Sequence, residues 1–417
     1  MKRTLMATAI TLTALCLTVS GCNKATSNNQ NAGAVKTGPG VTDTTIKLGS
    51  LVDLTAVFAS LSKSIVQGTQ LYWKQQNAAG GVCGRKVEVV VKDHAYDPQK
   101  AVSVYREIAS DVLAMQTILG SPVMSALRPA IGQDNMYAGF GGWSASVLAD
   151  NHIQVLGTTY DIEAISGLDF LMRTKGIKSG DKVGHVYFEG DFGENAFKGS
   201  QYLAGRSGLT IVGHKIKASD TDLSAQVAAL RNAGVTAILI SAGPTQSASV
   251  AGVAKSVGLN VPIVANGPGF TPQLLAGPAG PALKENLYVV SSLAPPGLDT
   301  PAAKKLQEDF SKEYADAVPT QVGSVFGYVQ ARVAKEVLQK ACDNKDLTRQ
   351  GMLDALHQSS GVDTGGLVAG TLDYTKAGQP PSRTVYISQV DAAVPGGLKA
   401  VGPAVEAEPA KTYQPGA

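Results

Sequence analysis

The sequence predicts an α/β protein made of two doubly wound lobes, each built on a parallel β-sheet. Short apolar segments rich in β-branched residues alternate with longer segments that have helical periodicity. The connections are short, which is typical of parallel strands with helices packed on both faces of the sheet. The alternation occurs in two separate blocks, and a chain of 417 residues is long enough for two or three cores.

The first block supplies one lobe. Its predicted strands cover residues 46–52, 87–91 and 115–119. A helix over 60–79 ends at Gly80-Gly81, because glycine readily adopts the left-handed turn that closes a helix. Asp97 and Pro98 predict the start of the next helix, since aspartate caps free N–H groups and proline suits the first helical turn.

The second block repeats the pattern and supplies the other lobe. Its predicted strands cover residues 182–188, 209–216, 237–241 and 263–265. Its predicted helices begin near residue 194 and cover 223–232 and 245–257.

The loops at the carboxyl ends of these strands are the expected ligand site, because doubly wound sheets bind ligands there. They are rich in glycine, serine and asparagine and carry few charges. They cover residues 53–60, 121–125, 139–146, 189–193, 242–246 and 266–270.

Composition and motifs exclude several classes of function. The chain has 36 Lys+Arg against 33 Asp+Glu and no run of five like charges, which argues against a nucleic-acid-binding protein. A hydrophobic content of 44% is too high for a disordered chain. No phosphate-binding loop, HExxH motif or GxSxG nucleophile elbow is present. We therefore expect that the protein is not an enzyme and that it has no catalytic residue, no cofactor and no metal site.

Two small clusters leave alternatives open. His94, between Asp93 and Asp97, has the residue types for metal binding or acid–base work, but it also suits a polar strand end before a capped helix. Asp191 and Glu194 could act as a carboxylate pair, or they could stabilise the positive end of a helix.

The N-terminus predicts export. A basic start is followed by an uncharged apolar segment that is too short for a lasting membrane span, so residues 1–21 are expected to be a signal peptide. Val19-Ser-Gly-Cys22 resembles the bacterial lipobox, which predicts lipid attachment at Cys22. The alternative is an ordinary signal cleaved elsewhere. The polar composition of residues 22–43 predicts a flexible tether. Residues 401–417, at the C-terminus, are expected to form a loose tail.

The cysteines divide according to this export prediction. Cys16 leaves with the signal and Cys22 carries lipid, so Cys83 and Cys342 remain. Two thiols in an exported chain suggest a disulfide, and two buried free thiols are the alternative.

Several segments in order resemble the leucine/isoleucine/valine-binding type of periplasmic substrate-binding protein. The likeness covers roughly residues 44–395. It is carried by the stretch from Asn77 to Val89, by Asp93-His-Ala-Tyr-Asp-Pro-Gln-Lys-Ala-Val, by Phe192-Gly-Glu, by Asp222 to Arg231 and by Ala254 to Leu259.

The resemblance implies a type I periplasmic binding fold, in which three chain crossings join the two lobes. We place the crossings near 156–162, 286–293 and 364–372. Lobe 1 would then comprise 44–158 plus 290–366, and lobe 2 would comprise 159–288 plus 369–400. Cys83 and Cys342 both fall in lobe 1, which favours a bridge between them. In the chain-entropy model such a bridge contributes of order 4–5 kcal/mol before native-state strain is subtracted.

The resemblance also implies a function. The expected protein is a monomeric, lipid-anchored receptor on the outer face of the cytoplasmic membrane. It would capture a small polar molecule, such as a branched-chain amino acid, an amide or a small carboxylate, and deliver it to the permease of an ABC importer. A ligand sensor of the same fold and a secreted hydrolase are the alternatives.

Carried over residue by residue, the resemblance predicts a set of ligand contacts. The expected lobe 1 contacts are Phe58, Ser121, Met124, Ser125, Gly141, Gly142, Trp143 and Ser144. The expected lobe 2 contacts are Phe192, Gly243 and Gly267.

In lobe 2 the sequence departs from the family pattern. The family's two binding-site tyrosines align with Phe192 and Gly243, and its ammonium-binding glutamate aligns with about Gly267. A buried ammonium without a carboxylate partner is costly, so the sequence favours an uncharged or anionic ligand unless Glu189 or Asp191 replaces the missing charge.

Overall fold

The computed structural model describes residues 35–315 and 321–415. The predicted signal peptide, the Cys22 attachment site and the first part of the tether lie outside the described residues. Val35–Ala417 forms one compact unit. Within its described part, no helix combines the length and the apolar content needed to cross a membrane.

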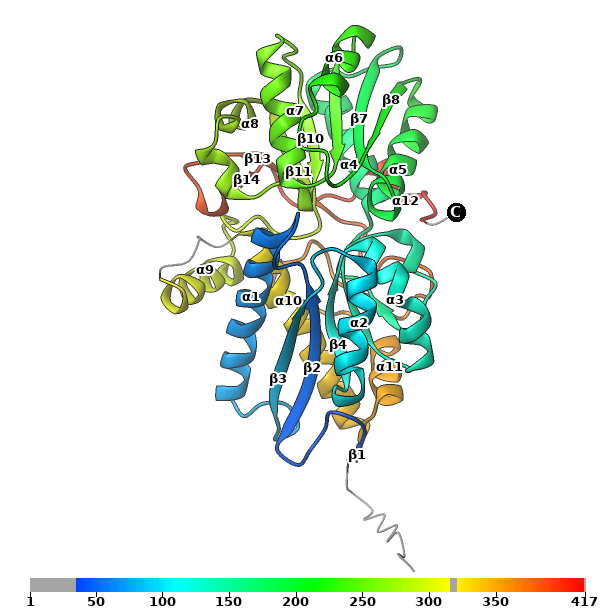
Figure 1. The fold of residues 1–417 in the computed structure, drawn as a ribbon, viewed down its shortest axis with the longest axis vertical. Helices are drawn as coiled ribbons and strands as arrows, with labels where there is room; N and C mark the ends of the chain where they lie inside the picture. Colours follow the sequence, from blue (N-terminus) through cyan, green and yellow to red (C-terminus); the bar gives the residue numbers. More distant parts are fainter. Residues whose placement is uncertain (1–34, 316–320, 416–417) are drawn as a thin grey trace, which may run out of the picture. The chain divides into compact units, whose positions relative to one another are not determined.

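A five-stranded, all-parallel sheet forms the centre of lobe 1 (Figure 1). Its strand order is β3-β2-β4-β5-β6. The strands are β2 (Thr45–Val52), β3 (Lys86–Asp93), β4 (Ala114–Leu119), β5 (Ala138–Gly141) and β6 (Ile153–Gln154). The helices that pack around it are α1 (Ala59–Ala78), α2 (Pro98–Ile108), α3 (Ser121–Gln133), α9 (Pro301–Glu313), α10 (Val322–Asp343) and α11 (Arg349–His357).

A seven-stranded sheet forms the centre of lobe 2, in the order β14-β13-β11-β10-β9-β7-β8. Its strands are β7 (Lys182–Phe188), β8 (Thr210–Ile216), β9 (Ala237–Ser241), β10 (Ile263–Asn266), β11 (Leu287–Ser291), β13 (Tyr386–Val390) and β14 (Leu398–Ala400). Five strands are parallel, and β13 and β14 add to one edge in antiparallel fashion. Its helices are α4 (Tyr160–Lys175), α5 (Asp191–Ser207), α6 (Ser224–Ala233), α7 (Pro244–Ser256), α8 (Gly280–Asn286) and α12 (Glu408–Lys411).

Short elements complete the chain. The two-residue strands β1 (Lys36–Thr37) and β12 (Asp346–Leu347) pair in parallel. The 3-10 turns are η1 (Ala109–Asp111), η2 (Ala145–Val147), η3 (Gly267–Gly269), η4 (Pro272–Ala276) and η5 (Pro395–Gly397).

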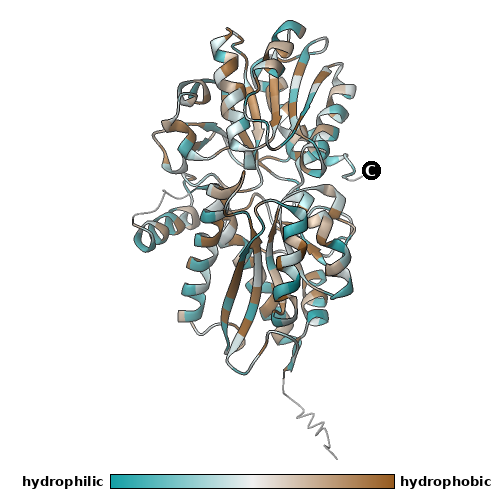
Figure 2. Ribbon diagram, viewed as in Figure 1, coloured by the Kyte–Doolittle hydropathy of each residue, from teal (hydrophilic) through white to brown (hydrophobic). Residues whose placement is uncertain are grey.

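Hydrophobic residues are frequent in the strands of both sheets (Figure 2), and the inner strands are the buried ones. Ile46 and Leu48 of β2 and Ile238 and Ile240 of β9 are almost wholly removed from solvent. Each such side chain stabilises the fold by roughly 1.5–3 kcal/mol. The α/β prediction with two parallel-sheet lobes is therefore confirmed, and the antiparallel edge of lobe 2 is an addition to it.

Most helices and strands predicted from the sequence begin and end within one or two residues of their positions in the structure. The Asp97 cap is confirmed, because its Oδ1 accepts hydrogen bonds from the N–H groups of Gln99 (2.7 Å) and Lys100 (3.1 Å). The helix predicted from residue 194 begins earlier, at Asp191, directly after Gly190 in a conformation with φ of 88°. Both acids therefore lie in the first turn of α5, where they stabilise the helix dipole.

Both predicted loose ends are more ordered than expected where the structure describes them. The N–H of Lys36 donates to Lys345 O and that of Gly38 to Leu347 O, which attaches the end of the predicted tether to lobe 1. At the other end, the buried Tyr413 and the guanidinium of Arg383, which donates to Tyr413 O (2.9 Å), hold the tail on lobe 2. Strand pairing and carbonyl capping by an arginine cannot be read from composition, which is why the sequence suggested disorder.

The three segments expected to cross between the lobes lie against one another. The N–H of Ala369 donates to Ser292 O (2.7 Å), and the Ser292 hydroxyl donates to Leu156 O (3.4 Å). Gly157 has a φ of 90°, and a Cβ atom there would lie 2.4 Å from Ser292 Oγ. β11 pairs within the lobe 2 sheet up to Ser291, so the second crossing follows that residue. We keep the division into two lobes as a proposal that these contacts support.

Cys83 and Cys342 form a disulfide, as the export prediction and the resemblance suggested. Cys83 follows α1, and Cys342 lies in the last turn of α10. The bridge therefore joins the ends of two neighbouring helices whose opposite ends lie at the carboxyl edge of the sheet.

Candidate functional site

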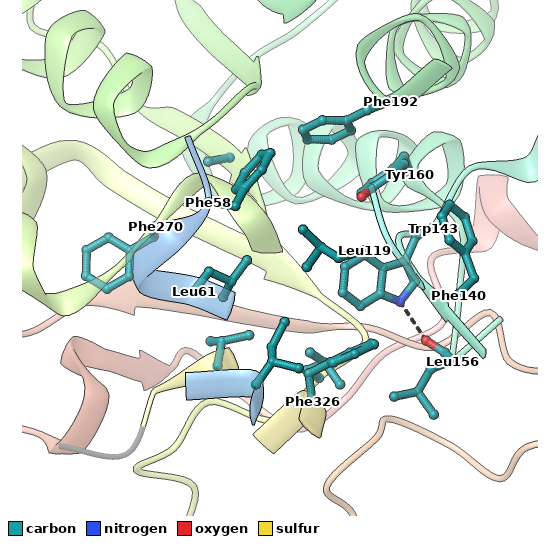
Figure 3. Close-up of a cluster of buried hydrophobic side chains, with 14 of the residues drawn as sticks. Phe58, Leu61, Leu119, Phe140, Trp143, Leu156, Tyr160, Phe192, Phe270 and Phe326 are labelled. Atoms are coloured by element: carbon teal, nitrogen blue, oxygen red, sulfur yellow. Dashed lines mark hydrogen bonds between the residues drawn. The ribbon is translucent and has the colours of Figure 1, made fainter. Parts of the chain in front are cut away.

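A cavity lies between the carboxyl-end loops of the two sheets. Together with the open space at its mouth, it encloses about 530 Å³ that no protein atom occupies. Eighteen residues from both lobes line it, and most are aromatic or aliphatic; Figure 3 shows Phe58, Trp143, Tyr160, Phe192 and Phe326 among them. The full lining is Phe58, Leu61, Ile65, Tyr96, Leu119, Gly120, Ser121, Gly141, Trp143, Tyr160, Phe192, Gly267, Pro268, Ser291, Leu293, Val322, Gly323 and Phe326.

An aromatic wall runs through the cavity from lobe 1 to lobe 2. The Trp143 ring contacts Phe326 edge-on at a centroid distance of 5.4 Å and Tyr160 at 5.8 Å. Tyr160 in turn packs on Phe192 of lobe 2 at 4.3 Å. The Trp143 N–H donates to Leu156 O (2.6 Å; Figure 3), so this polar group is satisfied by the protein and leaves an apolar ring for the ligand.

Close helix packing brings α1 and α10 to the cavity. A Cβ atom on Gly68 would lie 2.1 Å from Ser324 O, and one on Gly327 would lie 2.0 Å from Ile65 O. These glycines let the two backbones approach, so the first turns of both helices present Leu61, Ile65 and Phe326 to the same space. Residues of α10 therefore line the cavity because of this helix packing, and no local sequence pattern predicts that they do.

Buried Asp53 fixes the loop that carries Phe58. Its carboxylate accepts hydrogen bonds from the N–H groups of Thr55 (3.2 Å), Ala56 (2.6 Å) and Phe58 (2.8 Å). Phe58 then packs edge-on against Tyr96 at 4.9 Å. The acidic group is thus used by its own loop and lies outside the cavity lining.

In lobe 2 the buried carboxylate of Glu163 likewise fixes a loop by accepting hydrogen bonds from N–H groups. Its carboxylate accepts hydrogen bonds from Asn266 Nδ2 (2.8 Å) and the N–H of Ser292 (3.3 Å), and it also interacts with the N–H of Gly267. Burial raises the pKa of Glu163 to about 8, although these hydrogen bonds lower it. Glu163 therefore supports the loop at Gly267 from behind, and it does not line the cavity.

No charged side chain of the described residues lines the cavity. Glu189 and Asp191, which could have replaced the family's ammonium-binding glutamate, are not among its lining residues. Asp191 instead accepts a hydrogen bond from the Ser146 hydroxyl of lobe 1 (2.8 Å). The site therefore offers neither a carboxylate to an ammonium nor a cation to an anion.

The structure brings together six of the eleven residues predicted as ligand contacts. Phe58, Ser121, Gly141, Trp143, Phe192 and Gly267 all line the cavity. Their contact with a ligand stays a prediction.

The other five predicted contacts are not among the lining residues, and their surroundings are as follows. Met124 is in the lobe 1 core, and Ser125 is exposed on α3. Gly142 packs against the Phe140 ring, and Ser144 bonds to Ser146. Gly243 packs against Gln246 and Val57. Helix periodicity explains the difference along α3, since of its residues Ser121 lines the cavity while Met124 and Ser125 point elsewhere.

The sequence prediction missed two tyrosines that line the cavity, Tyr96 and Tyr160, and also Ser291. Tyr96 lies in the Asp93–Asp97 loop after β3, so its position at the carboxyl end of a strand was an available signal. Tyr160 lies within the first predicted crossing at 156–162, where the chain passes between the lobes. Phe326, Leu61 and Ile65 carry no such signal.

A model of the family described as periplasmic binding protein matches residues 45–396 of the chain. Among curated proteins, the Leu/Ile/Val-binding protein homolog 8 of Brucella abortus (strain 2308) is 26% identical over 316 residues. That alignment covers 70% of this chain and 76% of the relative.

Solved structures share the fold over most of the chain. A fatty acid ABC transporter substrate-binding protein from Thermomonospora curvata has 48% sequence identity and a TM-score of 0.89, and the match covers 91% of this chain and 97% of that one. A branched-chain amino acid ABC transporter protein from Thermus thermophilus with bound valine has 19% identity and a TM-score of 0.79, with coverages of 89% and 99%. A solute-binding protein from R. palustris in complex with benzoate has 17% identity and a TM-score of 0.73, with coverages of 87% and 98%.

Proposed function

The chain belongs to the periplasmic binding protein family, whose members are non-enzymatic substrate-binding proteins of ABC transporters, and we propose that its ligand is a fatty acid. The observation that carries this proposal is the interlobe cavity, which is lined by aromatic and aliphatic side chains and, among the described residues, by no charge. The relative described as a fatty acid substrate-binding protein, at 48% identity, supports the same ligand class.

The apolar lining favours an acyl chain over an amino acid. Burying each CH₂ group of an acyl chain contributes about 0.8 kcal/mol. A zwitterionic amino acid would place its ammonium beside Phe192 and Gly267, where the cavity supplies no carboxylate. The small polar ligand expected from the sequence therefore fits this site less well than an aliphatic one.

Delivery to a permease would depend on closure of the lobes around the ligand. Phe58, Trp143 and Phe326 come from lobe 1, while Phe192 and Gly267 come from lobe 2. A ligand that contacts both sets stabilises the closed form by its differential affinity. The transporter can then distinguish the loaded protein from the empty one. A sensor of the same fold would bind its ligand by the same physics.

We further propose that the protein acts outside the cytoplasm as a monomer and that lipid on Cys22 holds it at the membrane. Val19-Ser-Gly-Cys22 supports this proposal. Mass spectrometry of the exported protein should find an acylated Cys22, and a Cys22→Ser variant should be released from membranes. An unmodified N-terminus elsewhere would contradict the anchor.

Calorimetric titration tests the ligand class. The exported Cys22→Ser protein, stripped of bound lipid, would be titrated with saturated fatty acids of increasing length and with leucine and valine. Affinity for the fatty acids should rise about fourfold per CH₂ until the cavity is filled, and the amino acids should give no heat.

Tryptophan fluorescence provides an independent signal. Trp143 lines the cavity, whereas Trp73 lies in the lobe 1 core and bonds to Gln116. Fatty acid should therefore change the emission of the wild-type protein and leave that of Trp143→Phe unchanged. Binding of leucine in preference to every fatty acid would overturn the proposed ligand.

A further inference from the structure

Two tyrosine hydroxyls meet the apolar cavity from opposite lobes. Tyr96 belongs to the loop after β3 in lobe 1, and Tyr160 is the first residue of α4 in lobe 2. Both rings line the cavity, and Tyr160 is almost fully buried. In Figure 3 the Tyr160 hydroxyl points into the space between Phe58, Phe192 and Leu119.

Neither hydroxyl donates a hydrogen bond to another described residue, although the Tyr160 oxygen interacts with the backbone N–H of Trp143. Another buried tyrosine, Tyr105, does donate one, to Asp134 (2.8 Å). An O–H donor without an acceptor in an apolar cavity costs free energy, so a site that keeps two such donors is suited to an acceptor group that arrives with the ligand.

The surroundings hold both phenols in place. The Tyr96 ring packs against Phe58 and against Gly120, where a Cβ atom would lie 2.6 Å from the ring. Ala95 and Tyr96 have φ values of 51° and 56°, a left-handed conformation that costs free energy for residues other than glycine. Tyr160 is fixed between Trp143 and Phe192. The strained backbone at Ala95 and Tyr96 thus places the Tyr96 side chain at the cavity.

The cavity has a further hydroxyl, that of Ser121, and it has no hydrogen-bond partner among the described residues. Ser121 is buried, lines the cavity, and begins α3, whose first N–H groups have no partner within the helix. Such a helix end favours a negatively charged group. Burial raises the pKa of both phenols, and Asp191 contributes in the same direction, so the phenols are neutral donors at physiological pH.

We propose that the carboxyl group of the ligand accepts hydrogen bonds from Tyr96 of lobe 1 and Tyr160 of lobe 2, with Ser121 as a further donor. This inference rests on the proposed fatty acid ligand and specifies how its polar end is recognised. The acyl chain then lies along Phe58, Trp143 and Phe326. Because the two phenols belong to different lobes, one carboxyl group joins both, and closure depends on the head group as well as on the chain.

The test compares Tyr96→Phe, Tyr160→Phe and the double variant with wild type, in the exported Cys22→Ser protein. Tyr202→Phe, on the surface of lobe 2, is the matched control. Each ligand is offered as the free fatty acid and as its methyl ester. We expect each cavity variant to bind the acid about tenfold more weakly, because a hydrogen bond to a charged group is lost, and to bind the ester nearly as wild type does.

The outcomes separate this proposal from the proposed function. If wild type and both variants bind the acid equally, the tyrosine anchor is wrong while the fatty acid ligand stands. If the variants lose acid and ester alike, the tyrosines act only through packing, and the anchor is again wrong. If wild type binds no fatty acid, the proposed function fails and the anchor fails with it. A loss confined to the acid supports the anchor.

Discussion

The side-chain oxygen of Asn195 accepts a hydrogen bond from the N–H of Ala145 (3.2 Å), which joins α5 of lobe 2 to the 3-10 turn that follows β5 in lobe 1. The same oxygen accepts from the N–H of Asp161 (3.3 Å), and the Asn195 amide donates to the Asp161 carboxylate (3.1 Å). One buried side chain thus connects both lobes and the start of α4. The exposed Ser146–Asp191 hydrogen bond lies beside it.

Asn195→Ala should weaken ligand binding, because it removes a contact that exists only when the two lobes touch. We expect a loss of affinity of about 5- to 20-fold, equivalent to about 1–2 kcal/mol. Titration calorimetry measures it, and Asn232→Ala on the exposed face of α6 is the control. Ser146→Ala should have a smaller effect because water competes at an exposed bond. Unchanged affinity in Asn195→Ala would show that this contact does not contribute to closure.

Gly157→Ala should destabilise the protein by about 1–3 kcal/mol and also alter ligand affinity. The residue combines a positive φ with a Cβ position 2.4 Å from Ser292 Oγ, at the point where the crossings meet. Gly176→Ala is a matched control, since Gly176 has a φ of 75° and no atom within contact distance of an added Cβ. Denaturation and titration of both variants separate backbone strain from crowding. Equal effects would rule out a special role for Gly157.

The contribution of Glu163 to stability should decrease as the pH rises from about 5 to 8, and Glu163→Gln should remove it. Burial raises the pKa of Glu163 from 4.5 to about 8 in the folded protein. Between these values the folded state binds more protons than the unfolded state, so its stability falls with rising pH. Asp161, whose pKa is also raised by burial, contributes in the same direction.

Urea midpoints at pH 5.5, 7 and 8.5 measure this dependence. Wild type should lose stability across the series relative to Glu163→Gln, by an amount on the order of a few kcal/mol. Glu308→Gln, at an exposed position of α9, should behave like wild type. Parallel slopes in wild type and Glu163→Gln would exclude Glu163 as the source.

Removal of the disulfide should reduce stability without changing ligand affinity. Cys83 and Cys342 are 259 residues apart in sequence, so the bridge strongly restricts the unfolded chain. The double serine variant should lose about 5–6 kcal/mol at most. The bridge lies at the ends of α1 and α10 that are remote from the cavity, so fatty acid binding should persist. Reductant should destabilise wild type to the level of the variant, and a variant still sensitive to reductant would contradict the explanation.

The sequence by itself determined the secondary structure and the general position of the site. Asp97 with Pro98, the β-branched run over 87–91 and the paired glycines after 79 act through neighbours in the chain, so they can be recognised without a fold. Because doubly wound sheets bind ligands at the carboxyl ends of their strands, the loops at those ends were predicted as the site. These loops contribute Phe58, Ser121, Gly141, Trp143, Phe192 and Gly267 to one cavity.

Only the tertiary structure decided which side chains face the ligand. Ser121 and Ser125 lie on the same short helix, yet one faces the cavity and the other faces solvent, because the orientation of α3 is set by its packing on the sheet. Phe326 reaches the site through the glycine contacts between α1 and α10, more than 250 residues apart in sequence. Tyr96 and Tyr160 line one cavity, and Asn195 contacts Ala145, only because two lobes meet, and no local pattern encodes that approach.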